Sequence, residues 1–277
     1  MPSIVASLTV QRAGLLAATV LLLGSLAWLR DRPSSVSDVQ VVSVPAGEVR
    51  VHLLGSFSKD DKTIDPPGQT LQVPSFQIMK YQVTRGQYSE CVQMGICDAV
   101  TTDARTAGAA LPQTQVSWRD ATRYADWMSG QTGQRWRLPS VGEWQRAAAE
   151  RYPEQAGRVS ATFTQDPGAR MLAQYENGKI ARVDREAALQ PVGALGENSL
   201  GIADMAGHVW EWTDGCFARG VIRPDGSLER SADYCGVRIA AGAHHAAVIH
   251  FVRDASVGGC AVGLPPDHLG FRLVRSF

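Results

Sequence analysis

The stretch Thr132–Trp144, TGQRWRLPSVGEW, predicts a change from extended structure to helix. The segments before and after it can be interpreted from this point. Arg135–Pro139 predicts a short extended segment. Ser140–Glu143 is a capping-box pattern, in which Ser and Glu side chains satisfy the free backbone N–H groups at the start of a helix. We therefore expect an extended segment and then a helix through Ala149, with Trp144 facing the core.

A longer helix is expected just before this stretch. Apolar residues recur at helical spacing after Ser117, and they are Trp118, Ala121, Tyr124, Ala125 and Met128. Ser117 is a suitable N-cap, and Gly130 or Gly133 can end the helix. Thr84 is likewise a suitable N-cap for a shorter helix nearer the N-terminus.

Short strands are expected mostly toward the two ends of the chain. The candidate segments are Val39–Val44, Val49–Leu54, Leu71–Ile78, Trp210–Thr213, Val237–Ala240, His250–Arg253 and Gly270–Val274. Regular periodicity is lost over Arg151–Leu189, which predicts a long irregular loop. Helices in the first half and strands at the ends predict an irregular, loop-rich α+β fold rather than an alternating doubly wound sheet.

Composition excludes several classes of protein. The chain has 277 residues, of which 44% are hydrophobic and 19% charged, so a core can form and general disorder is excluded. Its length allows one large domain or two small ones. The 27 Lys and Arg balance the 27 Asp and Glu, and this absence of net charge argues against a nucleic-acid-binding protein.

The N-terminus carries a segment of its own. Ala13–Leu29 is uncharged and mostly apolar, with a length between that of a signal peptide's apolar region and that of a spanning helix. We assign residues 1–30 to a signal peptide or membrane anchor, 31–43 to a linker and 44–277 to the folded domain. A buried core helix is the alternative for the apolar segment. The signal-peptide and the membrane-anchor interpretations both imply export. They predict a periplasmic or cell-envelope location, with membrane attachment if the segment is uncleaved.

Five cysteines support export. Cys91 and Cys97 enclose a short loop with a glycine, and Cys216 and Cys235 enclose a polar, glycine-containing loop, so both pairs can form disulfides. Such bonds are typical of oxidising compartments. Reduced, unrelated thiols are the alternative for the first pair, and zinc is disfavoured because tight CxxC spacing is absent. Cys260 is left over, as a buried thiol or a weak candidate for catalysis.

Several blocks of the sequence resemble, in order, the formylglycine-generating enzyme or sulfatase-modifying-factor domain family. They are Val44–Gly47, Lys80–Thr84, Val116–Ala121, Thr132–Trp144, Asn198–Trp212 and Leu269–Leu273. The resemblance extends from about Val44 to the C-terminus. It implies an irregular α+β fold related to C-type lectins.

The resemblance also implies a structural calcium ion. The family segment corresponds to DMAGHVWE here, so the expected ligands are Asp204, Gly207, Val209 and Glu211. Carboxylate and carbonyl oxygens are the ligands that Ca²⁺ prefers. His208 stands where the family usually has Asn, at a position not expected to ligate. The alternative is that Asp204 and Glu211 cap a turn or pair with arginines.

Copper is not expected. The resemblance implies that active family members hold Cu(I) between two cysteines near the C-terminus, because soft thiolates suit this ion. The corresponding stretch Arg238–Phe251 contains no cysteine, and Cys260 has no partner. His244, His245 and His250 lie there instead, and we expect them to border a binding surface. Imidazoles can bind a metal, but histidines so close together are more often exposed or packed.

Two functions from different classes follow. The first is an exported maturation or accessory factor without true formylglycine-generating activity. The second is a non-catalytic, lectin-like module that binds a protein, peptide or glycan through the surface around Arg238–Pro266. Small and His residues in this stretch also occur in lectin-fold receptors diversified by retroelements, although drift in a degenerate pocket is the favoured explanation.

Overall fold

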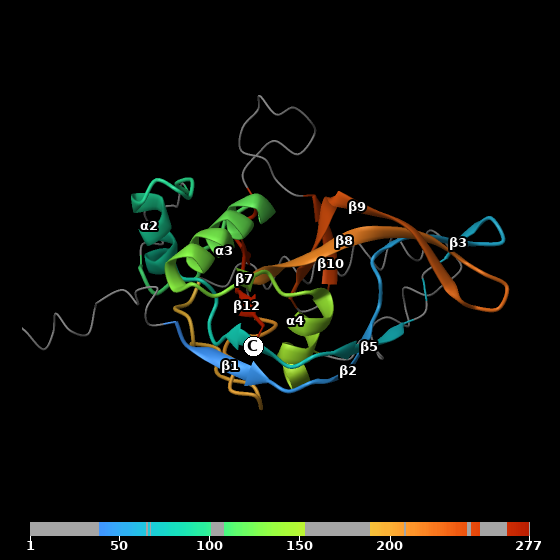
Figure 1. Ribbon diagram of the computed structural model, residues 1–277, viewed down its shortest axis with the longest axis horizontal. Coiled ribbons are helices and arrows are strands. Elements are labelled where there is room, and N and C mark those ends of the chain that lie inside the picture. The colour runs from blue at the N-terminus through green and yellow to red at the C-terminus, as the bar shows by residue number, and fades with distance from the viewer. Residues whose placement is uncertain are drawn as a thin grey trace, which may run out of the picture.

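The computed structural model describes residues 39–64, 66, 68–100, 108–152, 189–207, 209–242, 245–249 and 265–276. In this part of the chain the helices are α2 (Arg85–Gln93), α3 (Trp118–Thr132) and α4 (Val141–Ala148), and a 3₁₀ turn, η3 (Ala149–Arg151), follows the last. Short strands make up most of the remaining regular structure (Figure 1). The expected α+β class is confirmed.

Local capping signals fix where the helices begin. Thr84, Ser117 and Ser140 each accept a hydrogen bond from the backbone N–H three residues later, and each forms a complete capping box. Gly133 ends α3 in the left-handed region, with φ 68°. The helix starts and the α3 end expected from the sequence are therefore confirmed.

The beginning and the end of the described chain meet in one antiparallel sheet. Its strands lie in the order β1-β6-β12-β7, and they are β1 (Val41–Val44), β6 (Phe76–Met79), β12 (Val274–Arg275) and β7 (Trp136–Arg137). Val41–Ser43 lie in β1 and pair with β6, so the linker predicted for 31–43 extends too far into the fold.

A second sheet carries the most prominent feature of the molecule. Its order is β10-β9-β8-β3-β4, with β11 beside β8, and its strands are β10 (His245–Ile249), β9 (Leu228–Ala241), β8 (Trp210–Ile222), β3 (Gly55–Lys59), β4 (Lys62–Ile64) and β11 (Leu269–Gly270). β8 and β9 form a long antiparallel ribbon that extends away from the helices (Figure 1). A separate pair, β2 (Gly47–Val51) and β5 (Gln69–Val73), lies near α4.

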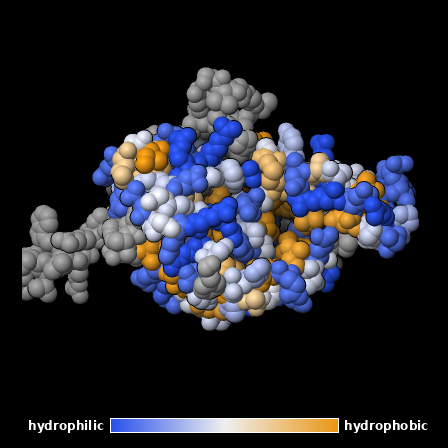
Figure 2. All heavy atoms as spheres, viewed as in Figure 1, coloured by the Kyte–Doolittle hydropathy of each residue, from blue (hydrophilic) through white to orange (hydrophobic). Residues whose placement is uncertain are grey.

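This ribbon corrects the loop predicted between Cys216 and Cys235. Half of the residues of β9 are exposed, and Val221 and Tyr234 on the ribbon are 46% and 55% exposed. Figure 2 shows hydrophilic residues mixed with small apolar areas over this face. On β8 the residues from Ala218 to Ile222 alternate between buried and exposed. Residues 229–235 of β9 are exposed on both faces, so in this part of the ribbon the alternation of apolar and polar residues that reveals half-buried strands is missing.

Three expected segments differ from the structure or lie wholly or mostly outside the residues that it describes. The predicted strand Gly270–Val274 is wrong as a single element, because β11 and β12 are two separate short strands. β10 was not predicted. The predicted strand His250–Arg253 and most of the predicted loop Arg151–Leu189 lie outside the described residues.

Two apolar clusters form the core. The first gathers around α3 and includes Tyr88, Tyr124 and Phe271, whose rings contact one another. The second gathers around Trp144 of α4 and packs against Ile78. Burying such a side chain contributes about 1.5–3 kcal/mol. In the described residues no helix is both long and apolar enough to span a membrane, and the segment Ala13–Leu29 lies outside them.

Candidate functional site

Glu211, one of the expected calcium ligands, lies at the centre of a hydrogen-bonded junction. Its Oε1 accepts bonds from Gln82 Nε2 at 2.9 Å and Arg272 Nη2 at 2.7 Å. Its Oε2 accepts bonds from Trp144 Nε1 and Arg272 Nε, both at 2.7 Å. The Glu211 and Arg272 side chains are 0% exposed. This carboxylate is therefore paired and bonded on both oxygens.

Arg272 uses its other donors to connect distant segments. Its Nη1 donates to the carbonyl of Lys80 at 3.1 Å, and its Nη2 donates to the carbonyl of Ala203 at 3.0 Å. The junction thus links β8, α4, the turn after β6 and the C-terminal segment. Removal of one partner of a buried ion pair is strongly destabilising, because it leaves an uncompensated buried charge.

Asp204 organises a turn beside this junction. Its carboxylate accepts bonds from the backbone N–H of Gly193 and, at 2.9 Å, from that of Leu195. Its backbone is in the left-handed region, with φ 57°, and its carbonyl accepts a bond from Gly207 N at 3.2 Å. Asp204 therefore holds the turn around residues 193–195 against the segment that precedes β8.

The residues expected to bind calcium do not fit that ion in this arrangement. Ca²⁺ requires about six to eight oxygen ligands. The Asp204 and Glu211 carboxylates already accept N–H groups, and the Arg272 cation occupies the space beside Glu211. The geometry matches the alternative in which these carboxylates cap a turn and pair with arginine. Within the described ranges no group of three or more His, Cys, Asp or Glu is placed to hold a metal.

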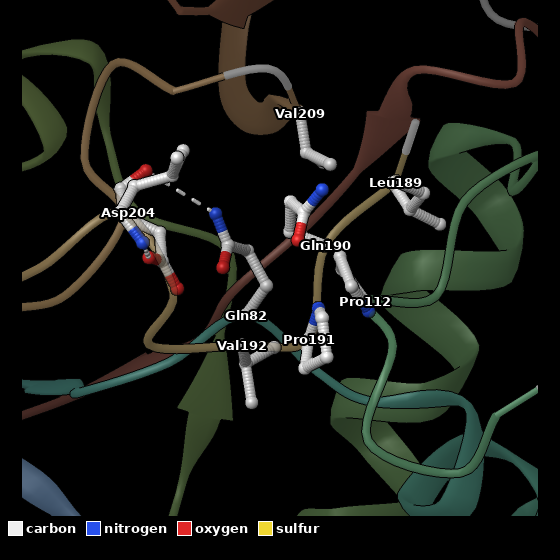
Figure 3. Close-up of a pocket in the computed structure, with 9 residues that line it drawn as sticks. Gln82, Pro112, Leu189, Gln190, Pro191, Val192, Asp204 and Val209 are labelled. Carbon is white, nitrogen blue, oxygen red and sulfur yellow. Dashed lines mark hydrogen bonds between the residues drawn. The ribbon is translucent and has the colours of Figure 1, made fainter. Parts of the chain in front are cut away.

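A small cavity adjoins the junction (Figure 3). Gln82 lies between Asp204 and Gln190 in this view, and Val209, the other expected calcium ligand, lines the cavity from above. The cavity measures about 20 Å³, room for roughly one water molecule. Within the described chain, Gln82 Oε1 is buried without a hydrogen-bond partner, so a water fits this place better than a substrate.

His245 is the one residue of the predicted histidine surface that lies within the described ranges. Its ring stacks on Tyr152 with centroids 5.0 Å apart and meets Trp144 edge-on at 6.1 Å. Its Nδ1 lies 3.3 Å from Tyr152 Oη, and burial raises the pKa of Tyr152 to about 12. His245 thus packs β10 against the region of α4. His244, His250 and Cys260 lie outside the described residues.

A second arginine, Arg238, lies at the base of the ribbon. Its guanidinium stacks on the Trp118 ring at 3.6 Å from the centroid. Its Nη1 donates to the carbonyl of Asp214 at 3.0 Å and to Cys216 Sγ at 3.1 Å. Burial lowers the pKa of Arg238, and burial also raises the pKa of Asp214.

A bidentate ion pair lies next to this group. Arg137 Nη1 and Nη2 donate to the two carboxylate oxygens of Glu143 at 2.7 and 2.6 Å. Burial raises the pKa of Glu143, but the bonds from Arg137 and Ser140 outweigh it, and the net shift is downward. The pair ties β7 to the start of α4.

Both predicted disulfides are present. Cys91 bonds to Cys97, and both residues are at most 5% exposed. Cys216 bonds to Cys235 across the ribbon, where Cys235 is exposed. Five cysteines less these four leave Cys260 as the one remaining thiol of the chain.

Sequence reasoning missed the partners that define the junction and the ribbon base. Arg272 lies inside the family block Leu269–Leu273, which marks the residue but does not reveal its buried partner. Gln82 likewise lies inside the block Lys80–Thr84. The contact of Arg238 with Trp118 had no local signal, because the two residues are distant in sequence.

Comparison with known proteins defines the class. The family model of the sulfatase-modifying factor enzyme 1-like domain matches residues 30–277. The chain therefore belongs to the sulfatase-modifying factor, or formylglycine-generating enzyme, family. This agrees with the resemblance seen in the sequence.

Individual relatives are distant. The formylglycine-generating enzyme of Mycobacterium tuberculosis is 34% identical over 38% of this chain and 33% of its own length. The inactive C-alpha-formylglycine-generating enzyme 2 of Mus musculus is 33% identical over 37% of this chain and 32% of its own length. The chain thus matches about a third of these relatives' length. The structure of PvdO from Pseudomonas aeruginosa, 22% identical, covers 86% of this chain and 94% of its own, with a TM-score of 0.51, which supports the fold.

Proposed function

We propose that this protein is an exported accessory or maturation factor of the cell envelope that has no formylglycine-generating activity. The proposal rests on the arrangement of the cysteines. Four of the five cysteines are joined in two disulfides, which leaves Cys260 alone. While both disulfides are closed, the one remaining thiolate cannot form the two-cysteine Cu(I) centre that the family resemblance implies for active members.

The disulfides also support export. Stable disulfides form in the periplasm and in other oxidising compartments, and are rare in the cytosol. Thiol counting under denaturing, non-reducing conditions tests this on protein isolated from its native compartment. We expect one free thiol of the five cysteines. Five free thiols would contradict both the disulfides and the export argument.

The activity test uses a cysteine-containing sulfatase-type peptide, Cu(I) and O₂. An aldehyde-reactive probe reports any formylglycine, and we expect no labelled product. A Cys260→Ser variant is the matched control. Labelling by the wild-type chain that disappears in this variant would show that Cys260 acts in catalysis and would overturn the proposal.

On this proposal the protein acts by binding a protein, peptide or glycan. The surface from Arg238 toward the C-terminal segment is the proposed contact region. Arg238 and Trp118 present a stacked pair at its edge, and Ile249 at the end of β10 is 47% exposed. Aromatic and arginine side chains are enriched in binding surfaces. Cross-linking from Ile249 replaced by a photoreactive residue would capture the partner, and no adduct in envelope extracts would count against this surface.

A further inference from the structure

The disulfide of the ribbon lies at an irregular point of the β8–β9 pairing. Cys216 is in register with Arg238, whereas the next residue, Phe217, is in register with Tyr234. β9 therefore advances by four residues while β8 advances by one, which is a bulge. Cys235 lies within the bulge and is exposed, while Cys216 is partly buried. The Cys235 side of the bond is thus the side open to solvent.

A cation lies against the other sulfur. Arg238 Nη1 is 3.1 Å from Cys216 Sγ, and the guanidinium is fixed in place by its stacking on Trp118. An arginine guanidinium stays protonated in proteins. A neighbouring cation stabilises a thiolate, and a thiol with a lower pKa leaves a disulfide faster. Cys216 is therefore the better leaving group of the two sulfurs.

The other disulfide provides a contrast within the same chain. Cys91 and Cys97 are 0% and 5% exposed, and both belong to the apolar cluster around Tyr88 and Tyr124. Apolar surroundings disfavour the thiolate, and burial blocks an attacking thiol. The chain thus contains one disulfide suited to a structural role and one suited to exchange.

We propose that Cys216–Cys235 is a thiol-exchange site that reacts with an external low-molecular-weight thiol. The external thiolate attacks Cys235 Sγ and forms a mixed disulfide. The Cys216–Cys235 bond breaks, and its electron pair leaves on Cys216 as a thiolate beside Arg238. A second external thiolate then attacks the external sulfur of the mixed disulfide and releases Cys235. Two external thiols are oxidised to a disulfide, and one protein disulfide is reduced.

The test uses the full chain in a Cys260→Ser background and reduced glutathione as the probe. Samples are quenched by alkylation, and each cysteine-containing peptide is quantified by mass spectrometry. We expect Cys216–Cys235 to open at least about tenfold faster than Cys91–Cys97, because it is exposed and has the stabilised leaving group. The glutathione adduct should be on Cys235. Equal rates for the two bonds, or an adduct mainly on Cys216, would overturn the proposal.

Two arginine variants test the role of the cation. Arg238→Gln should slow the opening of Cys216–Cys235 roughly fivefold, because the leaving thiolate loses its charge partner. Arg230→Gln is the matched control on the same strand, since Arg230 pairs with Asp233, and it should leave the rate unchanged. An unchanged rate in Arg238→Gln would overturn the assignment.

The rate of the buried bond serves as a folding control. If Arg238→Gln also speeds the opening of Cys91–Cys97, the variant has lost structure, and Arg238→Lys then decides the matter. Lysine keeps the charge beside Cys216, so this variant should open within about threefold of the wild-type rate. A larger loss of rate in a folded Arg238→Lys protein would contradict a role for the charge.

Discussion

Two arginines of this molecule, Arg272 and Arg238, each lie close to a tryptophan and an acidic residue, yet their surroundings differ. Arg272 is fully buried and donates to both oxygens of Glu211 and to backbone carbonyls. Arg238 lies at the base of the ribbon, stacks on Trp118 and contacts a disulfide sulfur. The first arrangement has its hydrogen-bonding groups paired and supports the fold. The second leaves a cation beside a reactive bond, which suits chemistry or binding.

The largest expected difference between the two regions is in stability. Arg272→Met leaves the Glu211 carboxylate buried without its cation, so we expect a loss of about 3–5 kcal/mol in the free energy of unfolding. Arg238→Met, at the more open site, should cost about 1 kcal/mol. Urea unfolding of both variants measures the difference. Equal losses would show that the two arginines contribute equally to the free energy of unfolding.

Two serine substitutions test the same comparison with smaller expected changes in stability. Ser140 caps α4, the helix that carries Trp144 into the junction, and Ser140→Ala should cost about 1 kcal/mol. Ser227 bonds to Asp225 in the exposed turn of the ribbon, and Ser227→Ala should stay within about 0.5 kcal/mol of wild type. Thermal unfolding gives both values. A ribbon variant that costs as much as the helix-cap variant would contradict the view that the ribbon contributes little to global stability.

Acid pH should reveal the ion pair of Arg137 and Glu143. The pKa of Glu143 is lowered in the folded protein, since the bonds from Arg137 and Ser140 outweigh burial. Its contribution is therefore present above the unfolded pKa, about 4.3, and is lost as the pH falls through the folded value. We expect Glu143→Gln to be less stable than wild type by on the order of 1 kcal/mol at pH 7, with a smaller gap near pH 3. A gap that stays constant over this range would contradict the assignment.

The parts of the structure that sequence could predict are those with local causes. The caps at Ser117 and Ser140 and the short loop between Cys91 and Cys97 are encoded within a few residues. The helix starts and the disulfide pairs were therefore predicted correctly. The positions of the predicted helices and strands indicated the α+β class, and the resemblance to a known family then supplied the lectin-related fold.

The ribbon and the junction depend on solvent exposure and on contacts between residues distant in sequence, which local sequence patterns do not reveal. Residues 229–235 of β9 are exposed on both faces, so their polar sequence is typical of a loop. The partner of Glu211 is Arg272, 61 residues away, and two carboxylates near a glycine were interpreted as calcium ligands. The sequence shows a carboxylate that could pair with a cation. Whether that cation is a metal ion or an arginine depends on tertiary packing.

Calcium removal is expected to have the smallest effect of all. A calcium ion bound only by the folded state would add about 2.7 kcal/mol at a hundredfold excess over Kd, which corresponds to roughly 5–10 °C in Tm. Because the Glu211 oxygens accept bonds from Gln82, Trp144 and Arg272, we expect a chelator to leave Tm within about 1 °C of its value in excess calcium. Differential scanning fluorimetry with chelator and with added Ca²⁺, together with elemental analysis of the purified protein, makes the measurement. A Tm that falls with chelator and recovers with Ca²⁺ would show that the family's calcium site is retained, and that Arg272 and the ion must then be accommodated around the same carboxylate.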